Sequence, residues 1–301
     1  MIALMFPGQG AQAVGMGREL ADAFPIARRT YEEADDALGY SLSGACFEGP
    51  AERLVATEIC QPALLATSIA AFRVARDEGL AGDLAFGHSL GEYPALVAAG
   101  SLEFGAGLRL VAERGAAMQE AGDATPGAML AILGLDDAEA EALCAEAGDA
   151  WPANYNCPGQ VVASGTVAGI DRLERLAAAG AVKSARLAVS GAFHSPLMEP
   201  AARRLGPALA AWQPAEPSLA FLSTTTGRCE PTDRMREVLL DQLTSPVRFG
   251  AAVQEALDRG ADQFVELGPG RVLSGLVRRV RRDARVTQIG APEDLASLAT
   301  A

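Results

Sequence analysis

Histidine and lysine are scarce in this 301-residue sequence, which has two histidines and a single lysine, Lys183. Its five cysteines are scattered and include no CxxC pair, which argues against both a disulfide framework and a zinc site. We therefore expect no metal ion, and we expect no cofactor. No apolar run approaches the roughly 20 residues that span a bilayer, and the N-terminus lacks the basic start of a signal peptide. These absences predict a cytoplasmic protein that does not bind membranes.

The charge of the chain is strongly negative. Its formal net charge of −13 argues against nonspecific binding to nucleic acid. Such a chain also repels an acidic partner protein unless its basic residues gather locally. One gathering exists near the C-terminus, where six arginines fall within 15 residues: Arg271, Arg278, Arg279, Arg281, Arg282 and Arg285. This arginine cluster is either the solvated end of an amphipathic helix or a docking patch.

The order of apolar patterns divides the chain into parts. Helical patterns dominate about the first 120 residues and include runs at 68–78 and 104–121. Two short strand-like runs, Ile2–Phe6 and Leu84–Gly87, interrupt them. The stretch GDATPG at 122–127 is dense in helix breakers and marks a boundary. Further strands are predicted late in the chain, at 221–224 and 263–267. With 50% hydrophobic residues, the chain can form an α/β domain with a sizeable core.

Between these parts the rhythm of predicted elements changes. From a strand at 128–133 to a strand at 182–189 the order is βαββαβ, which is the split βαβ arrangement of ferredoxin-like domains. We predict an α/β fold in which 1–124 and 190–301 form an α/β-hydrolase-like large domain. A ferredoxin-like small subdomain at 125–189 is inserted into it, and a ligand cleft is expected where the two units meet.

The motif with the strongest chemical meaning is Gly87-His88-Ser89-Leu90-Gly91, which has the GxSxG pattern of a nucleophile elbow. It lies between a strand that ends at Gly87 and a helical pattern at 92–99, so Ser89 is placed on a sharp turn. Glycine is needed on both sides because a side chain there would meet the neighbouring backbone. Free N–H groups at the start of the helix face the oxyanion that forms when a serine attacks a carbonyl. We predict that Ser89 is a nucleophile.

A serine hydroxyl is a weak nucleophile and needs a base. The sequence offers only His88 and His194. His88 adjoins Ser89 on a turn where neighbouring side chains diverge, so His194 is the predicted base. No acid between Ser89 and His194 follows a strand of the main sheet, as the acid of an α/β-hydrolase triad does. We therefore expect a Ser–His dyad that is oriented by a neutral acceptor.

The turn Gly8-Gln9-Gly10-Ala11-Gln12-Ala13 has two interpretations. It fits the GxGxxA fingerprint of dinucleotide-binding folds, which would indicate a nicotinamide-dependent oxidoreductase. However, no acidic residue ends a second strand about 20 positions further on, and Pro7 stiffens the turn. A turn that presents the Gln9 side chain as a donor to an oxyanion fits better.

Arg114 is the most informative residue after the dyad. At helical spacing its neighbours are Leu110, Val111, Ala117 and Met118, so it lies on an apolar stripe. An arginine buried there needs an anion, because an unpaired buried charge is costly. The alternatives are a side chain that snorkels to solvent or a partner from elsewhere in the fold.

Together these features resemble one family, the malonyl-CoA:acyl-carrier-protein transacylases and the related acyltransferases of polyketide synthases. The resemblance covers essentially the whole chain. It rests on an ordered set of motifs: FPGQG at 6–10, QPA at 61–63, GHSLGEY at 87–93, Arg114-Gly115 with Met118, NYNCPGQV at 154–161, GAFHSPLM at 191–198, SPVRF at 245–249 and ELGPG at 266–270.

The resemblance implies a role for each matching residue. Ser89 is implied as the nucleophile and His194 as the base. Gln9 and the backbone N–H of Leu90 are implied to form the oxyanion hole. Arg114 is implied to hold the free carboxylate of malonyl. The substrate-binding positions that it implies are Arg114, Met118, Phe193, Gln61, His88 and Asn156.

The implied activity is transfer of malonyl from malonyl-CoA to an acyl carrier protein, in fatty-acid or polyketide synthesis, and we expect a monomer. Phe193 matches the malonyl-selecting form of the family's specificity motif. Arg248 departs from some bacterial relatives, which have glutamine there, in a segment that offers His194 a backbone carbonyl in the family. Two alternatives stay open on the same scaffold: a serine acyl-thioester hydrolase, and a silent module that binds carrier protein. The silent module is disfavoured because every catalytic position is filled.

Overall fold

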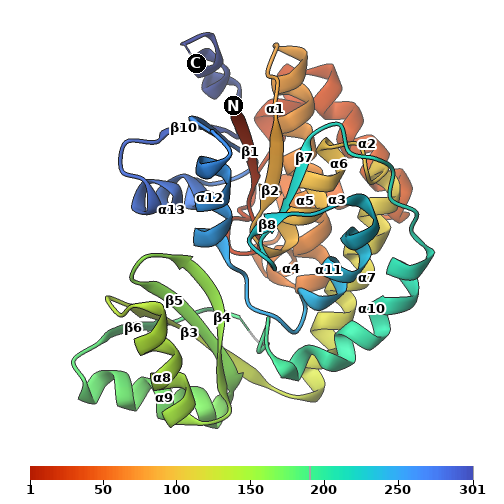
Figure 1. Ribbon diagram of the computed structural model, residues 1–301. Helices are drawn as coiled ribbons and strands as arrows, with labels where there is room; N and C mark the ends of the chain where they lie inside the picture. Colours follow the sequence, from red (N-terminus) through yellow and green to blue (C-terminus); the bar gives the residue numbers. More distant parts are fainter. Residues whose placement is uncertain (190, 301) are drawn as a thin grey trace.

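The computed structural model describes residues 1–189 and 191–300, so Ser190 and Ala301, which fall in the predicted large domain, lie outside the described residues. It contains two β-sheets, one above the other in Figure 1. The larger sheet has six strands: β1 (Ile2–Phe6), β2 (Leu84–Gly87), β7 (Ala220–Ser223), β8 (Arg228–Cys229), β9 (Gln263–Leu267) and β10 (Arg285–Ile289). Their order is β10-β9-β1-β2-β7-β8. All neighbours pair in parallel except β7 and β8.

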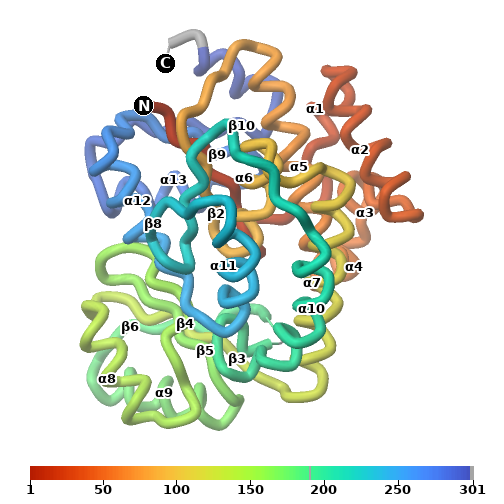
Figure 2. The backbone as a smooth tube through the Cα atoms, turned by 45° about the vertical axis from the view of Figure 1, so that its right-hand side comes forward, coloured from red at the N-terminus to blue at the C-terminus, as the bar shows by residue number. Residues whose placement is uncertain are grey.

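The central strand β1 is buried on both faces, as parallel strands usually are. Its alternate residues enter two different cores. Leu4 and Phe6 join the core formed with α2 (Pro25–Leu38), α5 (Thr57–Asp77) and α7 (Phe104–Ala124). Ala3 and Met5 join the core formed with α12 (Phe249–Asp258) and α13 (Val272–Val280). The large sheet is therefore covered by helices on both faces, as Figures 1 and 2 show.

The remaining helices complete the large unit. They are α1 (Arg18–Ala23), α3 (Leu42–Glu48), α4 (Ala51–Val55), α6 (Glu92–Ala98), α10 (Glu199–Ala211), α11 (Met235–Asp241), and the single-turn or 3₁₀ segments η1 (Ser89–Gly91), η2 (Pro196–Met198), η3 (Thr232–Arg234) and η4 (Pro292–Thr300).

The smaller sheet is formed within one stretch of the chain. Its elements are β3 (Gly127–Leu133), α8 (Asp137–Ala147), β4 (Ala150–Cys157), β5 (Gln160–Thr166), α9 (Val167–Ala179) and β6 (Lys183–Arg186). The strand order β4-β5-β3-β6 is antiparallel throughout, and a separate apolar core lies under α8 and α9. The predicted ferredoxin-like arrangement is confirmed, whereas the domain boundaries at 125 and 189 stay a prediction.

Backbone hydrogen bonds join the two units directly. The N–H of Tyr155 in β4 donates to the carbonyl of Val247 at 2.8 Å, and the N–H of Val247 donates to Ala153 at 2.9 Å. Val247 immediately precedes the segment that leads into α12. This bridge fixes one side of the small sheet next to the large unit (Figure 2).

The observed elements differ from the sequence prediction in several places. Helix α5 begins at Thr57 rather than Ser68, and it includes Pro62 in its second turn. Helix α7 continues through the expected boundary at Gly122, which is buried in it. Strand β6 ends at Arg186, because the next residues turn and the N–H of Val189 donates to the carbonyl of Leu187. Part of the arginine cluster lies in edge strand β10, which the sequence did not predict.

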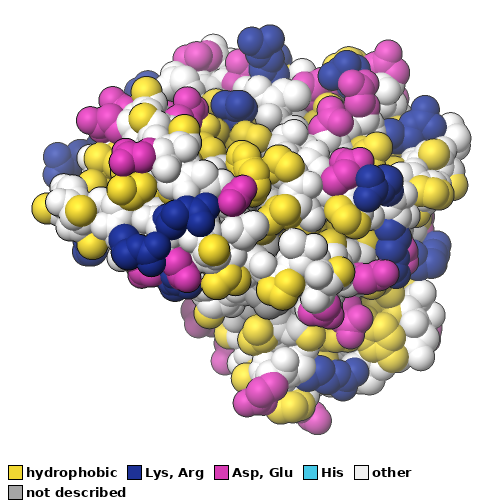
Figure 3. Space-filling view, turned by 90° about the horizontal axis from the view of Figure 1, so that it is seen from below, with side chains coloured by type: hydrophobic (Ala, Val, Ile, Leu, Met, Phe, Trp, Pro, Cys, Tyr) yellow, Lys and Arg dark blue, Asp and Glu magenta, His cyan; other side chains and the backbone are white. Residues whose placement is uncertain are grey.

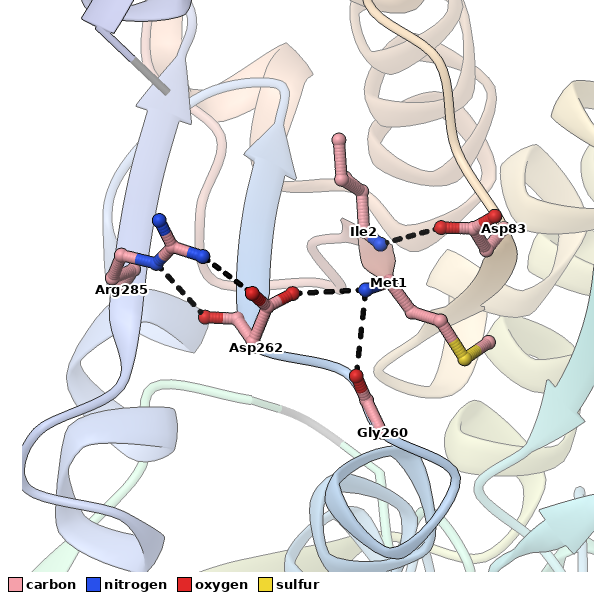
Figure 4. Close-up of polar contacts among 6 residues, drawn as sticks. All are labelled: Met1, Ile2, Asp83, Gly260, Asp262 and Arg285. Atoms are coloured by element: carbon pink, nitrogen blue, oxygen red, sulfur yellow. Dashed lines mark hydrogen bonds and ion pairs between the residues drawn. The ribbon is translucent and has the colours of Figure 1, made fainter.

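The starts of four neighbouring strands are held together by polar contacts (Figure 4). The amino group of Met1 donates to Asp262 at 2.9 Å, just before β9, and Asp262 also pairs with Arg285 at the start of β10. The N–H of Ile2 donates to the Asp83 carboxylate at 2.7 Å, just before β2. These contacts fix the edge of the sheet opposite to the one where ligands bind in such folds.

Surface charges are mixed on the face that Figure 3 shows, where acidic and basic side chains are scattered without a broad patch of one sign. Among the described residues, no helix is both long and apolar enough to cross a membrane.

Candidate active site

Ser89 occupies the predicted strand-to-helix turn. Strand β2 ends at Gly87, Ser89 begins the single turn η1, and α6 follows at Glu92. A Cβ atom on Gly87 would lie 2.2 Å from the backbone of Gly91, and one on Gly91 would lie 2.0 Å from the carbonyl oxygen of Phe6. The elbow is therefore as tight as the sequence predicted. The φ angle of Ser89 is 52°, a left-handed conformation that is unfavourable for residues other than glycine.

His194 reaches Ser89 from the loop that precedes η2. Its Nε2 lies 2.8 Å from the Ser89 Oγ, and its Nδ1 lies 2.8 Å from the backbone carbonyl oxygen of Gln242. Because a carbonyl only accepts hydrogen bonds, Nδ1 carries the proton and Nε2 is free to accept one from the serine. The predicted neutral acceptor is thus present. It comes from Gln242, just after α11, and a backbone hydrogen bond with Ser245, in the same segment as Arg248, also raises the pKa of His194.

Burial keeps His194 in the neutral form. The side chain is 4% exposed, and the loss of solvent together with the nearby Arg114 charge lowers its pKa to about 3. The φ angle of His194 is 59°, so it shares the left-handed backbone of Ser89. Both members of the dyad therefore occupy conformations that the surrounding structure must enforce.

Arg114 is a buried cation whose protein partners are all uncharged. The residue is 1% exposed, and its Nη1 donates to Gln61 Oε1 at 2.7 Å. Its Nη2 donates to Gln242 Oε1 at 2.8 Å and to Ser89 Oγ at 3.0 Å. No ion pair involves Arg114 in the part of the chain that the structure describes. The side chain does not snorkel to solvent. Its glutamine partners come from elsewhere in the fold and carry no charge.

A cleft of about 520 Å³ lies above these residues, between the carboxyl ends of β1 and β2 and the small sheet. Nine of the ten site residues predicted from the sequence line it: Gln9, His88, Ser89, Leu90, Arg114, Met118, Asn156, Phe193 and His194. The tenth, Gln61, lies behind Arg114 and also donates to the Met118 sulfur at 3.4 Å. No Asp or Glu is found among the described lining residues, although the chain has 38 acidic residues.

His88 points away from the serine hydroxyl. Its Nε2 hydrogen-bonds the Asn156 side chain at 2.9 Å, and burial lowers its pKa. The contact joins the nucleophile elbow to β4 of the small sheet. This geometry agrees with the inference that His88 is not the base for Ser89.

Two buried polar residues escaped the sequence analysis. Gln242 contacts His194 through its backbone, and Arg114 and the Ser89 carbonyl through its side chain. Glu92 is fully buried, and its Oε1 accepts from the backbone and hydroxyl of Thr224 and from Ser223. Burial raises the pKa of Glu92 to about 7. Gln242 lies outside every quoted motif, whereas Glu92 was visible within GHSLGEY but was given no role.

The dinucleotide interpretation of the N-terminal turn is not supported. After β1 the chain passes through turns and irregular backbone, and no helix begins until Arg18. A dinucleotide fingerprint needs a helix that opens at its glycines to receive the pyrophosphate. Gln9 instead lines the cleft with Ser89. No group of three or more potential metal ligands occurs among the described residues.

A doubly covered parallel sheet with a serine elbow and a histidine on the serine hydroxyl defines a class of enzymes that carry an acyl group on serine. Within that class, the chain belongs to the family described as the acyl transferase domain, whose model matches residues 4–293.

Individual relatives match over nearly their full length. The chain is 44% identical over 302 residues to the malonyl CoA-acyl carrier protein transacylase of Bacillus subtilis, covering 98% of this chain and 95% of that protein. It resembles the solved structure of the malonyl CoA-acyl carrier protein transacylase from Coxiella burnetii with a TM-score of 0.96 at 37% identity, covering 99% and 96% of the two chains. A structure of a type II PKS acyl-carrier protein in complex with its malonyl-transacylase matches with a TM-score of 0.94 at 39% identity, covering 98% of each chain.

Proposed function

We propose that this protein transfers malonyl from malonyl-CoA to the phosphopantetheine thiol of an acyl carrier protein, through a malonyl ester on Ser89. The observation that carries the proposal is the buried position of Arg114, a cation with no ion pair among the described residues, whose Nη2 lies 3.0 Å from the Ser89 Oγ. Malonyl is a short acyl group with a carboxylate at its far end, so its ester on Ser89 places an anion within reach of this cation. Relatives named for this activity support the same conclusion.

The first half of the reaction loads the serine. Ser89 Oγ attacks the thioester carbonyl while its proton passes to His194 Nε2, which lies 2.8 Å away. The C–S bond then breaks, and the CoA sulfur leaves with the proton from His194. Gln9 and the Leu90 N–H are the proposed donors to the oxyanion.

The second half transfers the acyl group to the acceptor. The phosphopantetheine thiol gives its proton to His194, and its sulfur attacks the ester carbonyl. The C–O bond to Ser89 breaks, and the proton returns from His194 to the serine oxygen. Gln242 keeps the imidazole in one tautomer through both halves, because its carbonyl holds the Nδ1 proton.

The remaining cleft residues are proposed to shape the acyl site. Met118 and Phe193 are buried apolar side chains at its wall. Gln61 holds the guanidinium of Arg114, and His88 with Asn156 fixes the elbow against the small sheet. That the protein acts in the cytoplasm and as a monomer remains a prediction from the sequence.

Intact-mass spectrometry after mixing with malonyl-CoA tests the proposal against the hydrolase alternative. A lasting gain of about 86 Da, from malonyl in place of the serine hydroxyl hydrogen, is expected of a transferase. The adduct should disappear when an acyl carrier protein is added, with malonyl appearing on the carrier. Steady release of CoA without an adduct and without malonyl-carrier would instead establish hydrolysis.

A further inference from the structure

Exposed apolar side chains gather at one place on this protein. The large apolar side chains that are exposed in the described residues are Met1, Val14, Val55, Val167, Leu187 and Val272. Three of these six, Val55, Leu187 and Val272, line the cleft above Ser89. That cleft is lined by fewer than a tenth of the residues of the chain. Its share of the exposed apolar side chains is therefore far larger than an even distribution would give.

The three residues come from elements that are distant in sequence. Val55 ends α4, Leu187 follows β6 of the small sheet, and Val272 begins α13. Their exposed fractions are 52%, 39% and 53%, whereas Arg114 and His194 in the same cleft are buried. The three side chains therefore stand where the cleft opens to solvent. We call Val55, Leu187 and Val272 the apolar collar.

We propose that the apolar collar is the surface on which the protein part of the acyl carrier protein rests while its arm reaches Ser89. This inference rests on the proposed function. A thiol on a protein-borne arm can reach a buried serine only through the opening of the cleft, so the protein that carries the arm must lie against the residues around that opening. An exposed apolar surface at such a place is typical of an interaction site.

Charges beside the collar favour an acidic partner. Arg271 adjoins Val272 and is exposed, with one long ion pair to Asp294 at 3.5 Å. Arg279, two turns further along the same side of α13, donates at 2.6 Å to Gln160, which lines the cleft. No ion pair to Arg279 occurs within the described part of the chain. Apolar contact with positive charge on one side complements an acidic protein, although the chain as a whole is negative.

Single aspartate substitutions in the collar test this inference. Val55→Asp, Leu187→Asp and Val272→Asp each place a charge where the partner would bury an apolar surface. Val167→Asp is the matched control, because Val167 is 43% exposed at the start of α9 and does not line the cleft. Three rates are compared: loading of Ser89 from malonyl-CoA, transfer to acyl carrier protein, and transfer to free pantetheine, which carries the thiol arm without a protein.

The collar variants should lose about tenfold in kcat/KM for carrier protein, mainly through KM. Transfer to uncharged pantetheine should fall far less than transfer to carrier protein. Loading from malonyl-CoA, whose phosphates pass the same opening, should also slow, and the control variant should match wild type in all three rates. Equal losses with pantetheine and carrier protein would show that the collar contacts the arm, which would overturn the inference. Unchanged carrier kinetics in folded collar variants would also overturn it. Failure of the proposed function would be seen separately, as wild-type protein that forms no adduct or never transfers it.

Discussion

Arg114 Nη2 lies 3.0 Å from Ser89 Oγ, so a fixed positive charge touches the atom that is proposed to carry the acyl group. Burial and, after it, the same charge lower the pKa of His194, which keeps the base neutral. One arginine is therefore proposed to bind the carboxylate of the substrate, and it also favours the neutral form of the histidine.

Removal of Arg114 should change the preference between substrates. Hydrogen bonds to charged groups contribute roughly 1.5–3 kcal/mol, so Arg114→Ala should lower kcat/KM for malonyl-CoA by about tenfold to a few hundredfold. Acetyl-CoA has no free carboxylate, so its loading should be unchanged or faster. Steady-state kinetics with both substrates measure the effect.

Because Arg114 is buried, its loss also leaves an empty space and removes the donor to the Oε1 atoms of Gln61 and Gln242. Arg114→Met keeps most of the volume, and thermal melting shows whether each variant is folded. If kcat/KM for malonyl-CoA and for acetyl-CoA fell by the same factor in a folded variant, the role of Arg114 would be structural. The assignment of malonyl as the substrate would then lose its main physical support.

Separate replacement of Ser89 and His194 should distinguish the role of the nucleophile from the role of the base. Ser89→Ala should give no acyl-enzyme by mass spectrometry, because Ser89 is the only hydroxyl hydrogen-bonded to His194 in the part of the chain that the structure describes. His194→Ala should slow acyl-enzyme formation by about 10²–10⁴-fold, the usual contribution of a general base. A malonyl adduct that persists in Ser89→Ala would place the nucleophile elsewhere.

Glu92 should make the folded protein less stable as the pH rises. Its folded pKa of about 7 lies above the ordinary value of 4.5, so the native state binds more protons than the unfolded chain between these pH values. The contribution of Glu92 to the free energy of unfolding is fully present below about pH 4.5 and is lost as the pH rises through about 7. At about 1.36 kcal/mol for each pKa unit, the loss is roughly 3 kcal/mol.

The variant Glu92→Gln keeps an acceptor for Thr224 but cannot ionise. Denaturant unfolding of both proteins from pH 5 to pH 8 should show the variant gaining stability relative to wild type. His194 also contributes to the pH dependence of stability, in the opposite direction: because its folded pKa is depressed, stability is lost as pH falls below about 6.5. This contribution is the same in both proteins, so it cancels when they are compared. A constant difference between the two proteins across this range would contradict a titrating Glu92.

Charge reversal in the arginine cluster should weaken use of carrier protein. Arg279→Glu and Arg278→Glu together should raise KM for an acidic carrier severalfold at low salt, without slowing malonyl-CoA loading. Arg279 is expected to dominate, since it contacts Gln160 at the cleft, whereas Arg278 donates to the carbonyl of Val286. Carrier kinetics that do not change with salt in the wild type would remove this role for the cluster.

The sequence predicted those parts of the site that depend on short local patterns. The elbow around Ser89 was visible because its glycines, strand and helix are contiguous, and His194 followed because the chain offers only one other histidine. The buried state of Arg114 followed from its helical stripe. Its partners did not, because Gln61 and Gln242 meet it only when α5, α7 and the end of α11 pack together.

Other features depend on tertiary context that no local pattern carries. The acceptor for His194 is a backbone carbonyl, and every residue has one, so its identity as Gln242 has no signal in side-chain chemistry. Strand β10 follows a charged segment and lies at the edge of the sheet, where it pairs only with β9. Its strand conformation depends on this pairing, which the sequence of the segment does not reveal. Helix α5 was predicted too short because Pro62 lies in its second turn, and a proline inside a helix removes a backbone hydrogen bond and usually marks a helix boundary.

The backbone of the dyad has a consequence for how this family can change. Ser89 and His194 both have the positive φ angles that glycine adopts without strain. Ser89→Gly should therefore be inactive yet more stable than Ser89→Ala, by up to about 1 kcal/mol, which thermal melting can measure. An equal or lower melting temperature for the glycine variant would show that the turn is not strained. At both positions the backbone conformation favours glycine or asparagine, whereas the proposed reaction needs serine and histidine. A duplicated gene that is no longer selected for activity should therefore accumulate glycine or asparagine at these two positions.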